Sequence, residues 1–161
     1  MHGWPLAALV AVVVVIVVVR RLKGEPLNAR DLAVPPVILL TIGIMTLARA
    51  DAVTAADYAW VVPGALLGAG LGALRASTVR IFERDGVLWQ RYTGRTFLVL
   101  AGSLAVMAAY GFLAARGGMH PEARPAQLTV GVSFLGESLV LGCRGLRSGI
   151  PFAPEKERRA R

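Results

Sequence analysis

Glu137 is the side chain in this 161-residue sequence whose type and position most clearly suggest chemistry. It falls slightly past the middle of an apolar block, where a carboxylate is expensive to bury and is expected to face the interior of a helix bundle. Thr129, Ser133 and Glu137 recur every four residues, and Arg144 follows seven residues later near the same helix face. This polar stripe is a candidate site for a proton or a cation, as in a small proton-coupled transporter.

A structural role for Glu137 is the preferred interpretation. The acid would be protonated or hydrogen-bonded and would fix helix packing, with Thr41 or Ser103 as its partner at a similar depth. No histidine lies near this depth, and Cys143, the only cysteine, has no partner base, so no nucleophile constellation appears. We therefore expect a protein that is not an enzyme and that binds no cofactor.

Metal ligands are scarce in this sequence. A single cysteine cannot form an internal disulfide or a thiolate cage around a metal ion. Asp51 and Asp57 could bind a cation, but two carboxylates at the end of an apolar block are expected to be solvated. We expect no metal site.

Three glycines at four-residue spacing, Gly64, Gly68 and Gly72, form a doubled GxxxG pattern within the third apolar block. Such a face lets another helix approach closely. Packing against a helix of the same chain is the preferred interpretation, and homo-oligomerisation remains the alternative.

The segment 78–93 shows a hairpin pattern, because two stretches of near alternation flank the turn dipeptide Asp85-Gly86. A two-residue turn places Phe82 opposite Trp89. The predicted outward face comprises Arg80, Phe82, Arg84, Trp89 and Arg91. The other face would carry Val79, Ile81, Leu88 and Tyr92. The outward face would contact anionic lipid headgroups or dock a partner protein, and a short amphipathic helix is the structural competitor.

The elements that must position these side chains are membrane helices. The sequence is 55% apolar with 17% charged residues, and its mean hydropathy is +0.59, which is too apolar for one water-soluble core of this size. Five blocks, each about 24 to 30 Å long as a helix, match a hydrocarbon core of about 30 Å. They cover residues 4–19, 32–48, 55–74, 96–115 and 126–143. We expect an all-α membrane domain over residues 1–150, with a cytoplasmic hairpin between helices three and four, and a basic cytoplasmic tail over residues 151–161.

The second block contains Pro35-Pro36, and residues that precede proline avoid the α region. We therefore expect the regular helix to begin at this pair, with residues 28–34 as a lead-in or a kinked first turn.

Charge predicts the topology. The net charge is +8, and 15 of the 18 Lys and Arg residues follow the first, third or fifth block, whereas Arg49, Arg116 and Arg124 lie on the opposite side. The positive-inside rule places the N-terminus outside and the C-terminus in the cytoplasm. In a bilayer protein this basic excess indicates loops at the anionic leaflet rather than nucleic-acid binding.

Several segments resemble the CcdC-like family of small bacterial integral membrane proteins. They are residues 21–27 (RLKGEPL), Pro35-Pro36, the Gly-rich third block running into residues 74–80 (LRASTVR), Asp85-Gly86 and Trp89. The likeness covers roughly residues 20–116, so Glu137 lies outside it. The resemblance implies residence in the bacterial cytoplasmic membrane and an association with cytochrome c biogenesis, but it brings no catalytic residues. The lack of paired cysteines argues against a thiol-disulfide relay within this chain.

These features together predict a non-enzymatic, multi-pass membrane protein that acts as an accessory or assembly partner. The alternative is a small proton-coupled transporter that uses Glu137. Expected partners are the bilayer with its anionic headgroups and either a membrane-protein partner or further copies of the chain.

Overall fold

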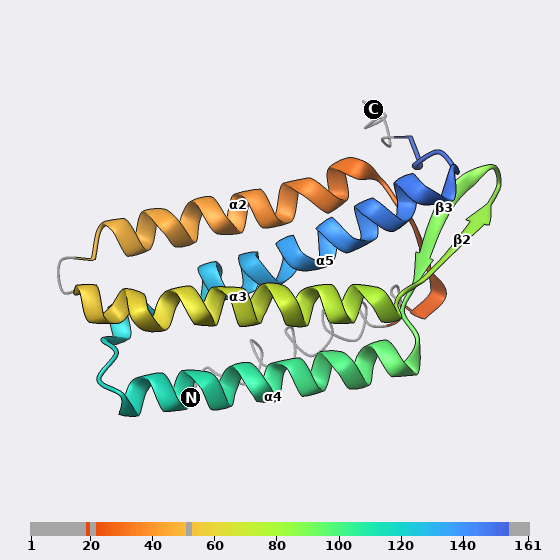
Figure 1. Ribbon diagram of the computed structural model, residues 1–161. Coiled ribbons are helices and arrows are strands. Elements are labelled where there is room, and N and C mark those ends of the chain that lie inside the picture. The colour runs from red at the N-terminus through yellow and green to blue at the C-terminus, as the bar shows by residue number, and fades with distance from the viewer. Residues whose placement is uncertain (1–18, 20–21, 51–52, 155–161) are drawn as a thin grey trace, which may run out of the picture.

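The computed structural model describes residue 19 and residues 22–50 and 53–154, and four long helices dominate them (Figure 1). The helices are α2 (Ala29–Ala48), α3 (Ala55–Thr78), α4 (Gly94–Arg116) and α5 (Ala126–Ser148). Each is long and apolar enough to cross a bilayer. The described residues therefore hold four membrane-length helices instead of the five predicted, and the first predicted span, residues 4–19, lies outside them apart from Val19.

Helix α2 begins earlier than predicted, with both prolines inside it. Asn28 caps the helix, because its Oδ1 accepts a hydrogen bond of 2.8 Å from the Arg30 backbone N–H. Pro36 has no N–H to donate to the carbonyl oxygen of Leu32 four residues earlier. Ser138 of α5 donates its hydroxyl to that oxygen instead, at 2.7 Å. The prediction that the helix starts at Pro35 was wrong because this tertiary contact replaces the missing helical bond.

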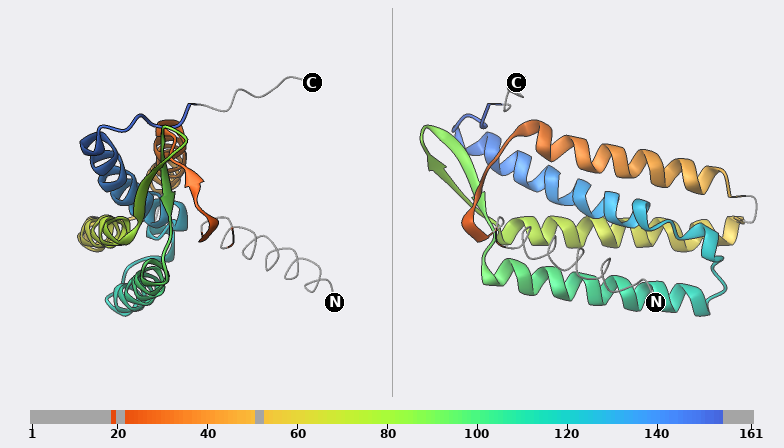
Figure 2. Two further views of the ribbon diagram at one scale, coloured as in Figure 1. Left: turned by 90° about the vertical axis from the view of Figure 1, so that its right-hand side faces the viewer. Right: turned by 180° about the vertical axis from the view of Figure 1, so that it is seen from behind.

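Helix α5 packs against both α2 and α3, and glycines allow the close approach (Figure 2). On the α2 side, a Cβ at Gly43 would lie 2.5 Å from the Leu128 backbone nitrogen. On the α3 side, a Cβ at Gly72 would collide with the Ser133 carbonyl oxygen, and one at Gly136 would collide with the Ala69 carbonyl oxygen. Contact between backbones at these points sets how closely the helices approach.

Two strands form the predicted hairpin. Strands β2 (Arg80–Arg84) and β3 (Val87–Arg91) pair antiparallel, with Phe82 opposite Trp89. Asp85 and Gly86 both have positive φ, 56° and 73°, as a type I′ turn requires. A third strand, β1 (Glu25–Pro26), was not predicted; it pairs with the other edge of β3, so the strand order is β1-β3-β2.

The segment after α5 returns to the sheet. Gly149, with φ of 69°, ends the helix in the left-handed region, which suits glycine. The Leu88 N–H then donates to the Pro151 carbonyl at 2.9 Å, and the Ala153 N–H donates to the Leu27 carbonyl at 2.9 Å. The start of the predicted tail is thus hydrogen-bonded to the hairpin and to the linker before α2.

The sheet therefore closes one end of the bundle, as Figures 1 and 2 show. Beneath it lies a buried apolar cluster of Ala76, Val79, Tyr92 and Leu141. The opposite end carries the C-terminus of α2, the N-terminus of α3 and the short helix η1 (Pro121–Ala123), over a second cluster of Leu47, Ala114, Met119 and Ala123. Each end of the bundle has its own small core.

Candidate functional site

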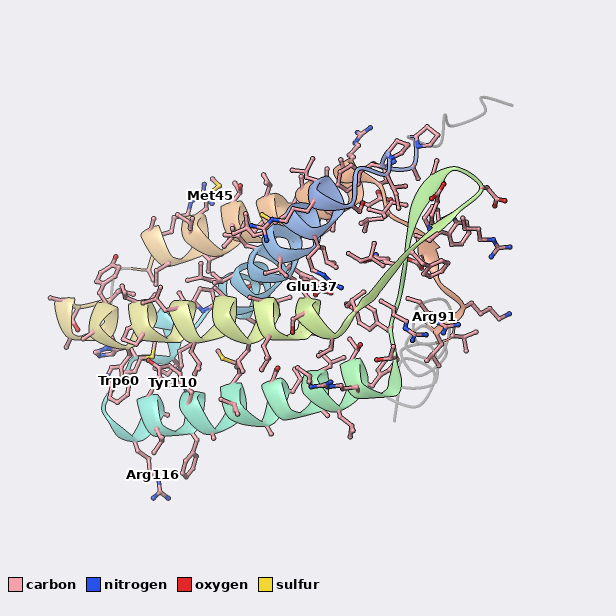
Figure 3. All side chains as sticks on the ribbon, turned by 45° about the vertical axis from the view of Figure 1, so that its right-hand side comes forward. Met45, Trp60, Arg91, Tyr110, Arg116 and Glu137 are labelled. Atoms are coloured by element: carbon pink, nitrogen blue, oxygen red, sulfur yellow. The ribbon has the colours of Figure 1, made fainter. Side chains whose placement is uncertain are left out.

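Glu137 lies on α5 with 4% of its surface exposed, and it faces α3 (Figure 3). The Arg75 guanidinium of α3 meets its carboxylate, with Nη2 at 2.5 Å and Nε at 3.0 Å from Oε2. Arg75 is itself only 6% exposed. This is a buried, charge-assisted ion pair in which two N–H groups donate to one carboxylate oxygen.

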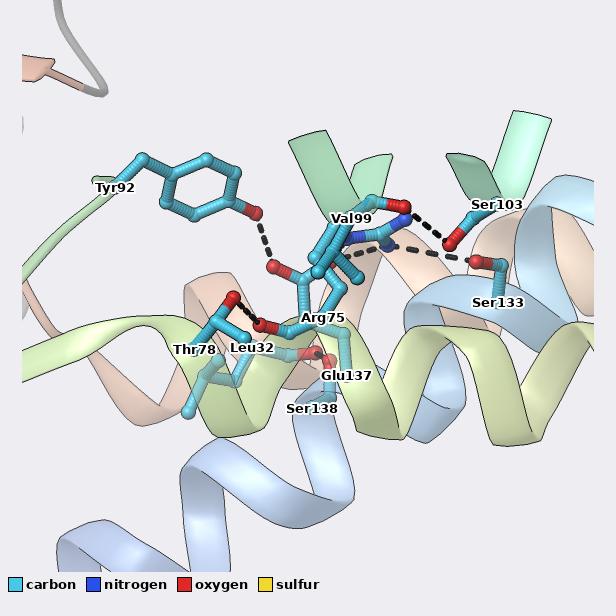
Figure 4. Close-up of polar contacts among 9 residues, drawn as sticks. All are labelled: Leu32, Arg75, Thr78, Tyr92, Val99, Ser103, Ser133, Glu137 and Ser138. Atoms are coloured by element: carbon cyan, nitrogen blue, oxygen red, sulfur yellow. Dashed lines mark hydrogen bonds and ion pairs between the residues drawn. The ribbon is translucent and has the colours of Figure 1, made fainter. Parts of the chain in front are cut away.

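Two neutral residues complete the group (Figure 4). Tyr92, just after β3, donates its hydroxyl to Glu137 Oε1, and its ring meets Phe97 edge-on at 5.7 Å between centroids. Arg75 Nη2 also donates to the Ser133 hydroxyl at 3.4 Å. We refer to Arg75, Tyr92, Ser133 and Glu137 as the Glu137 cluster. It connects α3, α5 and the end of the sheet.

The contacts of the Glu137 cluster are those of a buried ion pair with a structural role. Both carboxylate oxygens accept hydrogen bonds, and a cation balances the charge, so the acid is compensated inside the fold. Removing one member would leave the other charge unpaired in an apolar setting, which is strongly destabilising. This environment holds the three elements in one arrangement.

The structure brings together only part of the predicted polar stripe. Ser133 and Glu137 lie in the cluster, but Thr129 is exposed. Arg144 caps the end of α3, because its Nη1 donates to the carbonyls of Ala76 at 2.6 Å and Val79 at 2.9 Å. Ser133 and Glu137 therefore belong to the buried cluster, whereas Arg144 caps the end of α3.

The partners suggested for Glu137 were wrong. Thr41 and Ser103 donate to carbonyls of their own helices, those of Val37 and Val99. The true partner, Arg75, was counted among the loop residues because the predicted helix stopped at residue 74, whereas α3 continues to Thr78. A usable signal was present, since Arg75 continues the glycine face one turn beyond Gly72.

That glycine face is used within the chain. Gly68 lies beside Thr129 of α5, Gly72 lies against Ser133, and a Cβ at Gly64 would come within 2.7 Å of the Tyr110 ring on α4. Tyr110 in turn donates its hydroxyl to the Trp60 carbonyl at 2.5 Å. The three glycines thus allow α3 to pack closely against both α4 and α5.

The predicted outward face of the hairpin is formed by one side of β2 and β3. The exposed Arg84 lies over the half-buried Trp89 ring at 4.8 Å from its centroid, a cation–π contact. Arg80 and Arg91 are exposed cross-strand partners. Like charges placed directly opposite each other destabilise a hairpin unless an anion compensates them. This outward face is therefore suited to a negatively charged surface.

A second polar group lies at the far end of the bundle. Asp57, expected to be solvated, is 1% exposed, and its Oδ2 accepts from the Thr54 N–H and hydroxyl, both at 2.8 Å. Its Oδ1 accepts from the His120 N–H at 2.8 Å, and the His120 Nδ1 lies 3.0 Å from Oδ2. Asp57 thus caps α3 and holds the turn that precedes α5. The expectation of a solvated carboxylate was wrong for Asp57 because the turn folds back over it, and Asp51 lies outside the described residues.

Within the described ranges, no three His, Cys, Asp or Glu side chains converge as metal ligands would. Cys143 is exposed on α5. No protein-family model, curated protein or solved structure matches this chain.

Proposed function

We propose that this chain is a non-enzymatic, multi-pass membrane protein that acts as an accessory or assembly partner, with the outward face of its sheet as the docking surface. The observation that carries the proposal is the compensation of Glu137 by Arg75 and Tyr92. The most conspicuous intramembrane acid is engaged in holding the sheet to the helices. The exposed arginines around Trp89 then present positive charge to a partner with an acidic surface.

The proposal includes an orientation in the bacterial cytoplasmic membrane. The sheet and the segment after α5 lie at one end of the bundle, the end that carries most of the basic residues that the structure describes. By the positive-inside rule this end faces the cytoplasm, and the N-terminus lies outside. The resemblance to the CcdC-like family adds the expectation of a role connected with cytochrome c biogenesis.

Crosslinking in living cells tests the docking surface. A photo-reactive amino acid at Arg84 should capture one discrete protein, whereas the same group at Glu122, at the far end of the bundle, should not. Combining the Arg84 probe with Arg80→Glu and Arg91→Glu should abolish the capture, because the charge of the face is reversed. Recovery of lipid alone, or a protein crosslink that survives charge reversal, would contradict the proposal.

One observation favours the alternative of a small proton-coupled transporter. Glu137 also lines a cavity of about 140 Å³ between α2, α5 and the sheet, which could give a proton access to it. Proteoliposomes with an imposed pH gradient would then show a proton leak that Glu137→Gln abolishes. A leak that persists in Glu137→Gln, or no leak with the native chain, would dismiss the transporter.

A further inference from the structure

An apolar cavity of about 160 Å³ lies between α3, α4 and α5, toward the end of the bundle opposite the sheet. It shares no lining residue with the cavity beside Glu137, and the proposed docking function does not use it. Its volume is close to that of an engineered apolar cavity of about 150 Å³ that holds a benzene molecule. It therefore has room for one ring or for a short length of hydrocarbon chain.

This cavity exists because α4 packs against α3 and makes few contacts with α5. Figure 1 shows α4 running beside α3, on the side away from α2. Trp60 of α3 and Tyr110 of α4 form the aromatic part of the wall and meet edge-on at 6.1 Å between ring centroids (Figure 3). At Gly111 of α4, a Cβ would find open space. The α4 side of the cavity therefore has room for a ligand atom where most residues would place a side chain.

Arg124 places a positive charge at the end of the cavity nearest η1. Its Nη1 donates to the Gly111 carbonyl at 3.3 Å, which brings the guanidinium from the turn before α5 across to α4. A guanidinium has five N–H donors, and this bond uses one of them. Among the described residues, no acid forms an ion pair with Arg124. An exposed cation beside an apolar wall is complementary to a ligand that has both an anionic group and a hydrocarbon part.

The Thr129 hydroxyl lines the same cavity one turn into α5. Thr41 and Thr46 of α2 each donate their hydroxyl to the carbonyl four residues earlier. The equivalent carbonyl for Thr129 is that of Pro125, which already accepts the backbone N–H groups of Leu128 and Thr129. Within the part of the chain that the structure describes, the Thr129 hydroxyl has no hydrogen-bond partner. Because Thr129 is exposed, a ligand in the cavity can accept this hydrogen bond.

We propose that this cavity binds one acyl chain of an anionic phospholipid, with the lipid phosphate on Arg124 and an ester carbonyl on the Thr129 hydroxyl. A phospholipid presents its phosphate, its ester carbonyls and its hydrocarbon in that order from the membrane surface inward. The chain presents matching groups in the same order, because Arg124 precedes α5, Thr129 lies one turn into it, and Val132 continues the apolar wall.

Other classes of ligand use only part of this lining. A neutral apolar molecule would leave the Arg124 guanidinium without an anion. A small soluble anion would bury none of the apolar wall, which is the larger part of the cavity surface. The four membrane-length helices place the cavity where phospholipid chains are available.

Quenching of Trp60 fluorescence by brominated phospholipids tests the site in the full-length chain. Trp4→Phe and Trp89→Phe leave Trp60, which lines the cavity, as the one tryptophan. The chain is reconstituted in phosphatidylcholine vesicles that contain a small fraction of either phosphatidylglycerol or phosphatidylcholine with one brominated acyl chain. These two lipids carry the same quencher and differ in headgroup charge. The site predicts stronger quenching by the phosphatidylglycerol at an equal fraction.

Two arginine variants test the contact with the phosphate. Arg124→Gln should lower the preference for phosphatidylglycerol about fivefold, the effect of one basic residue on an anionic lipid. Arg116→Gln is the matched control, because Arg116 is exposed at the same end but lies over the Phe112 ring, outside the cavity. It should keep the preference. Thr129→Val removes the hydroxyl and should weaken the association with phosphatidylglycerol about threefold.

Two glycine variants test the position of the acyl chain. Gly111→Leu fills the cavity from α4 and should reduce quenching by phosphatidylglycerol to that by phosphatidylcholine. Gly102→Leu adds the same side chain to α4 at a position that is also open but lies outside the cavity, so it should behave as the native chain does. Arg124→Gln changes an exposed side chain and keeps the test decisive if Gly111→Leu does not fold.

Three results would overturn the phospholipid site. They are equal quenching by the two lipids, a preference that survives in both Arg124→Gln and Gly111→Leu, and an equal loss of preference in Arg116→Gln. The last of these would show that the positive charge of this end attracts anionic lipid without a specific site. Since the crosslinking experiment probes the sheet at the other end of the bundle, either proposal can fail without the other.

Discussion

Single residues in this fold differ greatly in how much their removal would destabilise it, and the members of the Glu137 cluster are the clearest example. Arg75 and Glu137 are 6% and 4% exposed, so neither charge could be left without the other. A buried pair of this kind contributes little net stability when both members are present, yet breaking it is expensive. The cluster should therefore matter most for which arrangement of α3, α5 and the sheet the chain adopts.

Tyr92→Phe is predicted to destabilise the protein by about 2 kcal/mol, because it removes a hydroxyl that donates to a charged carboxylate. The ring contact with Phe97 is retained in this variant. Thermal or denaturant unfolding in detergent measures the change. Tyr58→Phe is the matched control, since Tyr58 is 47% exposed and should be nearly silent. Equal stability of the two variants would contradict the role given to Tyr92.

Ser138→Ala is predicted to destabilise by about 1 kcal/mol, because the Leu32 carbonyl loses its donor. In a Pro36→Ala background the backbone N–H of residue 36 can bond that carbonyl, so the same Ser138→Ala change should have less effect. Unfolding measurements on the single and double variants give the coupling. Fully additive effects would show that the hydroxyl does not replace the missing helical bond.

Contact between helices depends on glycines on the facing sides of α3 and α5. Gly72 and Gly136 each face a backbone carbonyl of the other helix, so even one methyl group has no room. Gly70, by contrast, lies on the same helix α3 with open space where a Cβ would be. Position on the helix, and not glycine content, determines which substitutions are tolerated.

Gly72→Ala is predicted to destabilise by about 2 kcal/mol or more, because the added methyl forces α3 and α5 apart. Gly70→Ala should be neutral or slightly stabilising, because alanine favours the helix. Comparing the midpoints of unfolding for the two variants checks this difference. If both behave alike, the close contact between α3 and α5 is wrong.

Elements that are determined by residues close together in the sequence were predictable. Those that depend on contacts between residues far apart in the sequence were not. Asp85-Gly86 fixed the hairpin register, and the spacing of Gly64, Gly68 and Gly72 marked a packing face. The start of α2 was missed because its compensating donor, Ser138, lies 106 residues away in sequence. Strand β1 was missed because two residues carry no periodicity. Arg75 was missed because the predicted helix stopped at residue 74, although its place one turn beyond Gly72 puts it on the same packing face.

The whole molecule has two dissimilar ends. One is closed by the three-stranded sheet, the linker before α2 and the segment after α5. The other is closed by Asp57 and His120, which hold the turn between α4 and α5 against the start of α3. Basic residues gather at the sheet end, and this asymmetry underlies the proposed orientation in the membrane.

Cysteine labelling in intact cells is predicted to distinguish the two ends. In a Cys143→Ser background, Glu122→Cys should react with a membrane-impermeant maleimide, and Asp85→Cys should react only after lysis. The result follows from placing the basic end in the cytoplasm. Labelling of Asp85→Cys from outside would reverse the orientation.

Arg75 and Glu137 form a structural pair, and a double-mutant cycle of unfolding in detergent tests this role most directly. Arg75→Gln and Glu137→Gln should each destabilise the protein by about 3 kcal/mol, because each leaves one charge buried without its partner. The double variant should be destabilised by much less than the sum of the two. Native-like stability of Glu137→Gln, or strictly additive effects, would contradict the claim.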